Sequence, residues 1–376
     1  MAMGITNKTL MERQAKLGAA IKKAGLAGLA LNPGPSLRYI TGLEFHLSER
    51  PVIGIFTPSG PMIIIVPELE AMKTEGVGYE VETVSYPEDP TMWSRAVEKG
   101  VKATRLEGDT IGVETLSFRV MEMRLLETAM PNAKIMAAQE ITASLRMQKD
   151  ADELACMRAA ADIAQRALRE ALPKIKIGMT EREAAVEITT QLFQQGSGSI
   201  LPFPPIMSSG PNSANPHAFP SERRLEDGDL LVIDWGASVD GYFSDITRTF
   251  GVGEVEEEYA TIHQIVQDAN AAARAIVKPG VTCAAVDKAA RDVIEKAGYG
   301  EYFIHRTGHG LGMEGHEEPY MRAGNQMKLE PGMTFTIEPG IYLPDRGGVR
   351  IEDDVAVTED GVESLTDMPR EMRFVG

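Results

Sequence analysis

Residues 230–250 read LLVIDWGASVDGYFSDITRTF, in which two β-rich runs flank an Asp-Gly pair. Because Asp-Gly between apolar runs is a strong hairpin signal, we place the centre of the turn between Val239 and Asp240. This register puts Asp234 directly opposite Asp245. Two like charges in opposite positions destabilise a sheet unless something positive lies between them. The stretch therefore predicts a hairpin that binds a cation.

A second stretch, TFTIEPGIYLPDRGGVRIEDDVAV, occupies residues 334–357 and repeats the same conflict. A turn centred on Asp345 pairs Glu338 with Glu352. A single acidic residue on a strand is usually solvated at the surface. The acidic residues of both hairpins instead lie in the most apolar strands of the chain, where unpaired charges are costly. We therefore interpret all four as metal ligands.

A glycine-rich segment, HRTGHGLGMEGHEEP, supplies the candidate for a fifth ligand. It holds three of the six histidines of the chain, His305, His309 and His316. Glycines let a backbone approach a metal closely, and we expect His309 to be the ligand. One imidazole and four carboxylates can hold two divalent ions ~3.5 to 4 Å apart. This oxygen-rich set suits manganese, with cobalt, iron or zinc as alternatives.

The second part of the chain contains a weak internal repeat. Lys176, Gly178 and Thr180 in KIGMTEREAA are echoed by Lys278, Gly280 and Thr282 in KPGVTCAAV. Each phrase opens a helix with a threonine as its N-cap candidate. Another helix precedes each phrase, near 150–172 and 256–277, and an acidic hairpin follows. The order predicts a pseudo-twofold α+β domain, with helices on one face of a curved antiparallel sheet and a site shared by its halves.

The first part of the chain has a different pattern. A helical spacing of apolar residues over 10–24 is followed by short apolar strands at 28–31, 52–56 and 62–66. Helix and strand signals then alternate to about residue 138, which is typical of an α/β layered domain with a mixed sheet. We predict an N-terminal domain over residues 1–145 and a catalytic domain over residues 146–376.

Composition excludes several classes of function. The 55 Asp and Glu against 38 Lys and Arg give a formal charge of -17, which would repel nucleic acid. No apolar run approaches the ~20 residues of a membrane helix, so we expect no membrane association. The two cysteines, Cys156 and Cys283, lie in helical patterns. We expect free buried thiols and a reducing, cytoplasmic location.

Together the two hairpins, the histidine segment and the phrase GGVRIEDDV resemble the creatinase, prolidase and methionine aminopeptidase superfamily, whose catalytic domain has the "pita-bread" fold. The resemblance covers nearly the whole chain. It implies that Asp234 holds one metal ion, that His309 and Glu338 hold the other, and that Asp245 and Glu352 bridge both.

The same resemblance assigns roles around the metal ions. It implies that His217, in NPHAFPSERRL, and His316 contact substrate or move protons. Glu338 is implied to assist proton transfer from the bridging water. Creatinase resembles this chain in fold but lacks the full metal set, so the five intact ligands argue against a creatinase-like activity. An additional N-terminal domain is found in proline-specific members, where it helps to form a homodimer.

The expected activity is cleavage of Xaa-Pro dipeptides. Prolidases of one type follow the motif HExP with an arginine that grips the substrate carboxylate, but this chain has Tyr320 there. Arg322, Arg350 and Arg50, in HLSERPVIG, are the candidate replacements. The alternative is an aminopeptidase P-like enzyme acting on longer peptides. A metal-free binding protein of the same fold is the third hypothesis.

Overall fold

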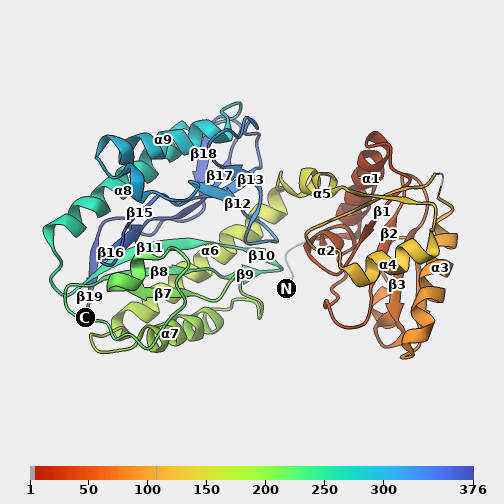
Figure 1. The fold of residues 1–376 in the computed structure, drawn as a ribbon, viewed down its shortest axis with the longest axis horizontal. Coiled ribbons are helices and arrows are strands. Elements are labelled where there is room, and N and C mark those ends of the chain that lie inside the picture. The colour runs from red at the N-terminus through yellow and green to blue at the C-terminus, as the bar shows by residue number, and fades with distance from the viewer. Residues whose placement is uncertain (1–4, 107) are drawn as a thin grey trace. The chain divides into compact units, whose positions relative to one another are not determined.

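The computed structural model describes residues 5–106 and 108–376. The chain divides into two compact units, one ending at Arg146 and the other running from Met147 to Gly376, and each has its own hydrophobic core (Figure 1). Within the described ranges, no helix combines the length and the apolar character that crossing a membrane requires.

The N-terminal unit is an α/β domain built on one mixed sheet, as the sequence predicted. Strand order is β4-β3-β2-β1-β5-β6, with antiparallel pairing of β2 to both of its neighbours and parallel pairing elsewhere. The strands are β1 (Gly28–Leu31), β2 (Ile53–Phe56), β3 (Met62–Pro67), β4 (Val81–Tyr86), β5 (Thr110–Val113) and β6 (Lys134–Ala137). The helices are α1 (Asn7–Lys23), α2 (Pro35–Thr41), α3 (Trp93–Thr104), α4 (Val120–Ala129) and α5 (Gln139–Arg146).

The C-terminal unit combines four long helices with two larger sheets. The helices are α6 (Ala151–Ala171), α7 (Glu181–Gln194), α8 (Glu257–Ile276) and α9 (Cys283–Lys296). One sheet has the order β19-β11-β8-β7, from β7 (Ile206–Ser209), β8 (Leu230–Trp235), β11 (Ile246–Val252) and β19 (Arg373–Val375). The other has the order β13-β12-β14-β17-β18, from β12 (Gly308–Gly310), β13 (Glu317–Met321), β14 (Thr334–Ile337), β17 (Asp353–Val357) and β18 (Val362–Ser364).

This unit has the repeat that the sequence predicted. The side chains of Thr180 and Thr282 cap α7 and α9, each accepting from a backbone N–H of its helix. Both threonines also form an isolated bridge, Thr180 to Arg224 ahead of β8 and Thr282 to Lys328 ahead of β14. In Figure 1, α8 and α9 lie together on one side of the strands, and α7 lies on the other with part of α6. The order helix, helix, hairpin occurs twice, which gives the pita-bread architecture.

The first hairpin differs from its predicted register. In β9 (Ser238–Val239) and β10 (Tyr242–Phe243), Val239 pairs with Tyr242, so the turn is centred between Asp240 and Gly241. Asp234 consequently pairs with Thr247 rather than with Asp245. A two-residue turn of this kind needs positive φ at both central residues, and Asp240 (φ 50°) and Gly241 (φ 84°) provide it. A β-branched valine is poorly suited to that conformation, which is why the predicted centre was wrong.

The second hairpin has the predicted register. In β15 (Gly340–Leu343) and β16 (Gly347–Arg350), Leu343 pairs with Gly347 around Asp345, which has a positive φ of 60°. The same register continues beyond this short ribbon into the pairing of β14 with β17. Glu338 and Glu352 lie in the gap between the two paired regions. Glu338 directly follows β14, and Glu352 directly precedes β17 (Asp353–Val357).

Candidate metal centre and substrate cavity

A cavity of about 780 Å³ lies within the C-terminal unit. One group of its lining residues is the predicted ligand set, Asp234, Asp245, His309, Glu338 and Glu352. A second group carries imidazole or guanidinium side chains: His217, His305, Arg306, His316 and Arg350. The remaining wall is apolar and includes Pro202, Phe203, Pro204, Ile206, Ala218 and Phe219. Charged and apolar groups therefore converge on one space, which is the usual form of an active site.

Both halves of the repeat contribute to the predicted ligand set. Asp234 lies in β8 and Asp245 immediately precedes β11, so the first half supplies these two. His309 lies in β12, Glu338 follows β14 and Glu352 precedes β17, so the second half supplies three. The two halves of the repeat thus bring the five residues to one cavity, as predicted. The role of each residue as a metal ligand stays a prediction.

The ligand atoms lie close together at the centre of this set. One side-chain atom each from Asp245, His309 and Glu352 lie within 4.8 Å of one another, and all three residues are buried. His309 Nε2 is 3.7 Å from Asp245 Oδ2 and 3.3 Å from Glu338 Oε1. Asp234 Oδ1 is buried without a hydrogen-bond partner among the described residues. Buried oxygen atoms that converge around an imidazole fit a divalent cation.

The charge balance of the site supports the same conclusion. Burial raises the pKa of Asp245 well above its usual range, and the nearby charge of Glu352 raises it further. Burial raises the pKa of Glu352 well above its usual range and that of Glu338 to about 7. Burial lowers the pKa of His309, and its Nδ1 donates to Gly310 O at 3.2 Å. The neutral ring therefore presents a lone pair at Nε2, the form that binds metals.

The glycines on either side of His309 are required by strand packing. A Cβ at Gly308 would lie 1.8 Å from Thr336 O, and a Cβ at Gly310 would lie 2.3 Å from Glu318 O. Real side chains cannot occupy such positions, so both glycines are required for β12 to lie between its neighbouring strands. This packing brings His309 to the cavity.

Several residues that hydrogen-bond the predicted ligands were not found by the sequence interpretation. The hydroxyl of Thr247 donates to Glu352 Oε2 at 2.6 Å. The backbone N–H of Asp245 donates to Asp354 Oδ2 at 2.9 Å. Both contacts join the first half of the repeat to the second, between residues more than a hundred positions apart. Contacts of this kind depend on tertiary packing, so no local sequence pattern predicts them.

Arg350 lines the cavity and hydrogen-bonds Asp234, one of the predicted ligands, and its role as a carboxylate clamp stays a prediction. It is 3% exposed, and its Nη2 donates to Asp234 Oδ2 at 2.6 Å. Its Nη1 donates to the hydroxyl of Tyr342 at 3.0 Å, and that hydroxyl lies 2.8 Å from His305 Nε2. Because His305 Nδ1 lies 2.7 Å from a backbone oxygen, Nδ1 is the donor and Tyr342 donates to Nε2.

The other two clamp candidates also have partners. Arg50 lies in the N-terminal unit, where its Nε and Nη2 donate to Glu88 Oε1 at 3.0 and 2.7 Å. Arg322 is exposed and its Nη1 donates to a backbone oxygen at 3.4 Å. Arg322 does not line the described cavity. A role for either arginine in substrate binding remains an untested prediction.

Arg306 is a cavity-lining cation that the sequence interpretation missed. Among the described residues it forms no ion pair with a carboxylate. Its guanidinium carbon lies 4.4 Å from the ring centroid of Tyr320, and its Nη2 lies 3.3 Å from His316 Nδ1. Stacking on an aromatic face leaves the edge of a guanidinium free to donate. Its only sequence signal was its position three residues before His309.

The two remaining predicted histidines lie at the mouth of the site. His316 and His217 both line the cavity and are exposed. The ring centroid of His316 is 3.9 Å from that of His309, and burial of part of its ring lowers its pKa. His217 follows Pro216 in a loop, where its backbone N–H donates to Asn215 Oδ1 at 3.1 Å. Their positions suit contact with a bound substrate.

The predicted carboxylate ligands should make the metal-free fold less stable as pH rises. The pKa of Glu338 rises from 4.5 to about 7 in the fold, so its contribution to stability is complete below pH 4.5 and is lost as pH rises through 7. Burial lowers the pKa of His263 and of His305 to about 4, which acts in the opposite direction, so the effect of Glu338 is measured as a difference between two proteins. In chelator, we expect the melting temperature of wild type minus that of Glu338→Gln to decrease between pH 5 and 8. A difference that increases over this range would contradict the assignment.

An α+β repeat that gathers buried carboxylates and a histidine into one cavity defines a metallopeptidase of the pita-bread class. This chain belongs to metallopeptidase family M24, whose sequence profile matches residues 155–359, and residues 13–148 match the creatinase/prolidase N-terminal domain. Membership of this family implies the use of divalent metal ions.

Similar proteins have been named or solved. The chain is 38% identical to "Probable dipeptidase PepE" of Mycobacterium tuberculosis over 96% of both chains. It is 41% identical to the Xaa-Pro dipeptidase of Pyrococcus furiosus over 70% of this chain and 75% of that relative. A crystal structure of prolidase from Thermococcus sibiricus superposes with a TM-score of 0.92 and 35% identity, covering 99% of this chain and 100% of that one.

Proposed function

We propose that this protein is an Xaa-Pro dipeptidase that uses two divalent ions. The names of its relatives support the substrate class. The observation that carries the dipeptide preference is the guanidinium of Arg306, which lies beside the carboxylate and histidine cluster and forms no ion pair with any carboxylate of the described residues. Manganese is the first choice of metal for an oxygen-rich set with one imidazole, and cobalt, iron or zinc are alternatives.

The proposed ligand set follows the distribution of the buried donors. Asp234, Asp245, His309, Glu338 and Glu352 would together hold the two ions, which would supply Lewis acidity at this end of the cavity. The pKa values of Asp245 and Glu352 are raised by burial and, further, by repulsion from neighbouring carboxylates, and bound cations would offset both effects, which supports this assignment. Arg350 holds Asp234 through one oxygen, which leaves Oδ1 for a metal.

The residues of this chain divide the chemical work. When bound, the divalent ions supply Lewis acidity and lower the pKa of a water molecule. The nitrogen of an Xaa-Pro bond carries no hydrogen, so the proline can leave as an amine only if that nitrogen receives a proton. Glu338 takes a proton from water during attack and returns it to this nitrogen. His316 and His217 hydrogen-bond the substrate and keep its carbonyl oriented.

The cavity wall matches the two ends of an Xaa-Pro dipeptide. Apolar residues, among them Phe203 and Phe219, form a surface that suits a proline ring and the preceding side chain. At the other end of the dipeptide, the guanidinium of Arg306 donates to the free carboxylate of the proline. This guanidinium is stacked on the ring of Tyr320. A substrate that continues beyond proline has no carboxylate at this position.

A substrate panel tests the proposal against its alternative. With the manganese-loaded enzyme, we expect kcat/KM for Xaa-Pro dipeptides to exceed that for Xaa-Pro-Xaa tripeptides and for amidated dipeptides. Replacing Arg306 by Gln should raise KM for free dipeptides by about 30-fold, the equivalent of about 2 kcal/mol for a lost charged pair at a partly exposed site. KM for amidated dipeptides should not change.

The matched control is Arg182→Gln, which removes the same side chain from an exposed position outside the cavity. Equal effects of Arg306→Gln on free and amidated substrates would remove Arg306 from carboxylate binding. Preferential cleavage of tripeptides would instead favour an aminopeptidase P-like enzyme. Absence of cleavage of every Xaa-Pro peptide would favour a binding protein of the same fold.

We also propose the assembly and location of the enzyme. The N-terminal domain, residues 1–145, would mediate a homodimer, and residues 146–376 would carry catalysis. A cytoplasmic location agrees with Cys156 and Cys283, which are both free and buried.

A further inference from the structure

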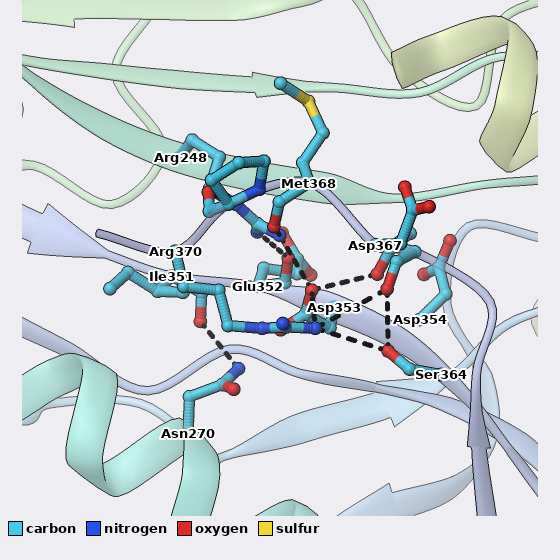
Figure 2. A network of polar contacts seen from close by, with 12 residues as sticks. Arg248, Asn270, Ile351, Glu352, Asp353, Asp354, Ser364, Asp367, Met368 and Arg370 are labelled. Atoms are coloured by element: carbon cyan, nitrogen blue, oxygen red, sulfur yellow. Dashed lines mark hydrogen bonds and ion pairs between the residues drawn. The ribbon is translucent and has the colours of Figure 1, made fainter. Parts of the chain in front are cut away.

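A buried polar network adjoins the two glutamates of the second hairpin. Figure 2 shows its members around Asp353, the residue that follows Glu352. They come from three parts of the fold: Arg248 from β11, Asn270 from α8, and Arg370 from the C-terminal segment. None of these described residues lines the cavity, so the network acts on the site only through the backbone that it holds.

Asn270 contacts the backbone immediately before each of the two glutamates. It is 0% exposed, and its Nδ2 donates to Ile337 O at 2.9 Å and to Ile351 O at 3.3 Å. These residues immediately precede Glu338 and Glu352. Asn270 Oδ1 accepts from Arg274 Nε at 2.7 Å, which fixes the orientation of the amide. One side chain therefore sets the separation of two strands just before each glutamate.

Arg248 holds Glu352 from the other half of the repeat. Its five N–H groups have five acceptors, at Thr247 O, Glu352 O, Asp353 Oδ1, Met368 O and Pro369 O. The bond to Glu352 O is 2.6 Å long, and the side chain is 4% exposed. Five donors in a planar fork are a property of arginine that lysine cannot reproduce. This guanidinium joins β11, β17 and the C-terminal segment.

The C-terminal segment completes the network. Arg370 donates to both oxygens of Asp353, at 2.7 Å from Nε and 3.0 Å from Nη2, and the hydroxyl of Thr366 donates to Oδ1 at 2.9 Å. The segment is fixed in turn by Gln165 of α6, whose Oε1 accepts from the backbone N–H of Met368 at 2.7 Å. Residues 364–370 are therefore bound to Asp353, the first residue of β17, which directly follows Glu352.

We propose that Asn270, Arg248 and the C-terminal segment 364–370 form a positioning scaffold that sets the separation of Glu338 and Glu352 for metal binding. The proposal rests on the ligand set proposed above. Hydrogen-bonding partners that orient metal ligands typically contribute 10- to 100-fold to metal affinity. The structure assigns such a role to side chains that lie outside the cavity, among them those of segment 364–370.

The test compares retention of manganese by the loaded, full-length protein across a graded series of chelator concentrations. For Asn270→Leu we expect half of the manganese to be lost at a chelator concentration about 10- to 100-fold lower than in wild type. Arg370→Gln should shift the same midpoint by about 10-fold. Because Arg370 lies at the edge of the network, with 19% of its side chain exposed, this variant should fold even if Asn270→Leu does not.

The control is Arg158→Gln, which removes another two-pronged arginine–carboxylate pair, to Glu363 at 2.7 Å, from a more exposed position. Its chelator midpoint should equal that of wild type. Variants that fold with a lower melting temperature but an unchanged chelator midpoint would overturn the proposal, because the network would then be structural only. Failure of the wild-type protein to bind manganese would instead refute the ligand set.

Discussion

Asp245→Asn should reduce turnover of Xaa-Pro dipeptides by more than about 1,000-fold, with metal binding weakened and the fold intact. Asp245 is buried, and one of its oxygens lies within 4.8 Å of ligand atoms from His309 and Glu352. A bridging carboxylate neutralises charge on both ions, which a neutral amide cannot do. The melting temperature of the metal-free variant should equal or exceed that of wild type, because the substitution removes a carboxylate that burial and Glu352 already disfavour.

Turnover, bound manganese and the metal-free melting temperature are the three measurements for this variant. Asp240→Asn is the matched control, since it makes the same change at the hairpin turn, where asparagine tolerates the positive φ. The control should retain wild-type turnover. Near-normal turnover in Asp245→Asn would show that the ligand assignment is wrong.

His316→Ala should retain both metal ions and lose about 100- to 10,000-fold in kcat, as expected for a group that moves a proton or orients the substrate. The ring of His316 lies against His309 and beside the guanidinium of Arg306, at the cavity surface. Its removal leaves every predicted ligand atom in place. His217→Ala should behave similarly, because His217 lines the same cavity.

Metal content and kcat together identify the role of these histidines. His46→Ala, at an exposed position of the N-terminal unit, is the control and should change neither quantity. Loss of manganese from His316→Ala or His217→Ala would make that histidine a ligand. Unchanged kcat with full metal content would remove it from the reaction.

The two hairpins show what local sequence predicts and what it does not. The centre predicted for the second turn, Asp345, was correct. The turn-forming residues from Pro344 to Gly348 lie around it, and Leu343 pairs with Gly347. In the first turn, the choice between a centre before or after Asp240 depended on backbone dihedrals, and the preference of Gly241 for positive φ decided it. The acidic residues reach one cavity in spite of that error, because Asp234 and Asp245 both remain at the same end of their strands.

The supporting residues were beyond local sequence patterns. Asn270 contacts strands 67 and 81 positions away, and its place on α8 is that of an ordinary helical residue. Arg248 follows an acidic hairpin and resembles any polar strand residue until the C-terminal segment supplies its acceptors. The sequence interpretation missed Arg306 because the reason to single it out is that no carboxylate of the described residues forms an ion pair with it, and this is visible only in the packed structure.

The central claim is that this chain cleaves Xaa-Pro dipeptides with two bound metal ions, and a metal titration tests it most directly. The protein is stripped with a chelator, manganese is returned in steps, and hydrolysis of an Xaa-Pro dipeptide is measured beside the bound manganese per chain. We predict no activity in the stripped protein and a rise that saturates at two ions per chain, with cobalt able to replace manganese. Full activity in the stripped protein would contradict the claim.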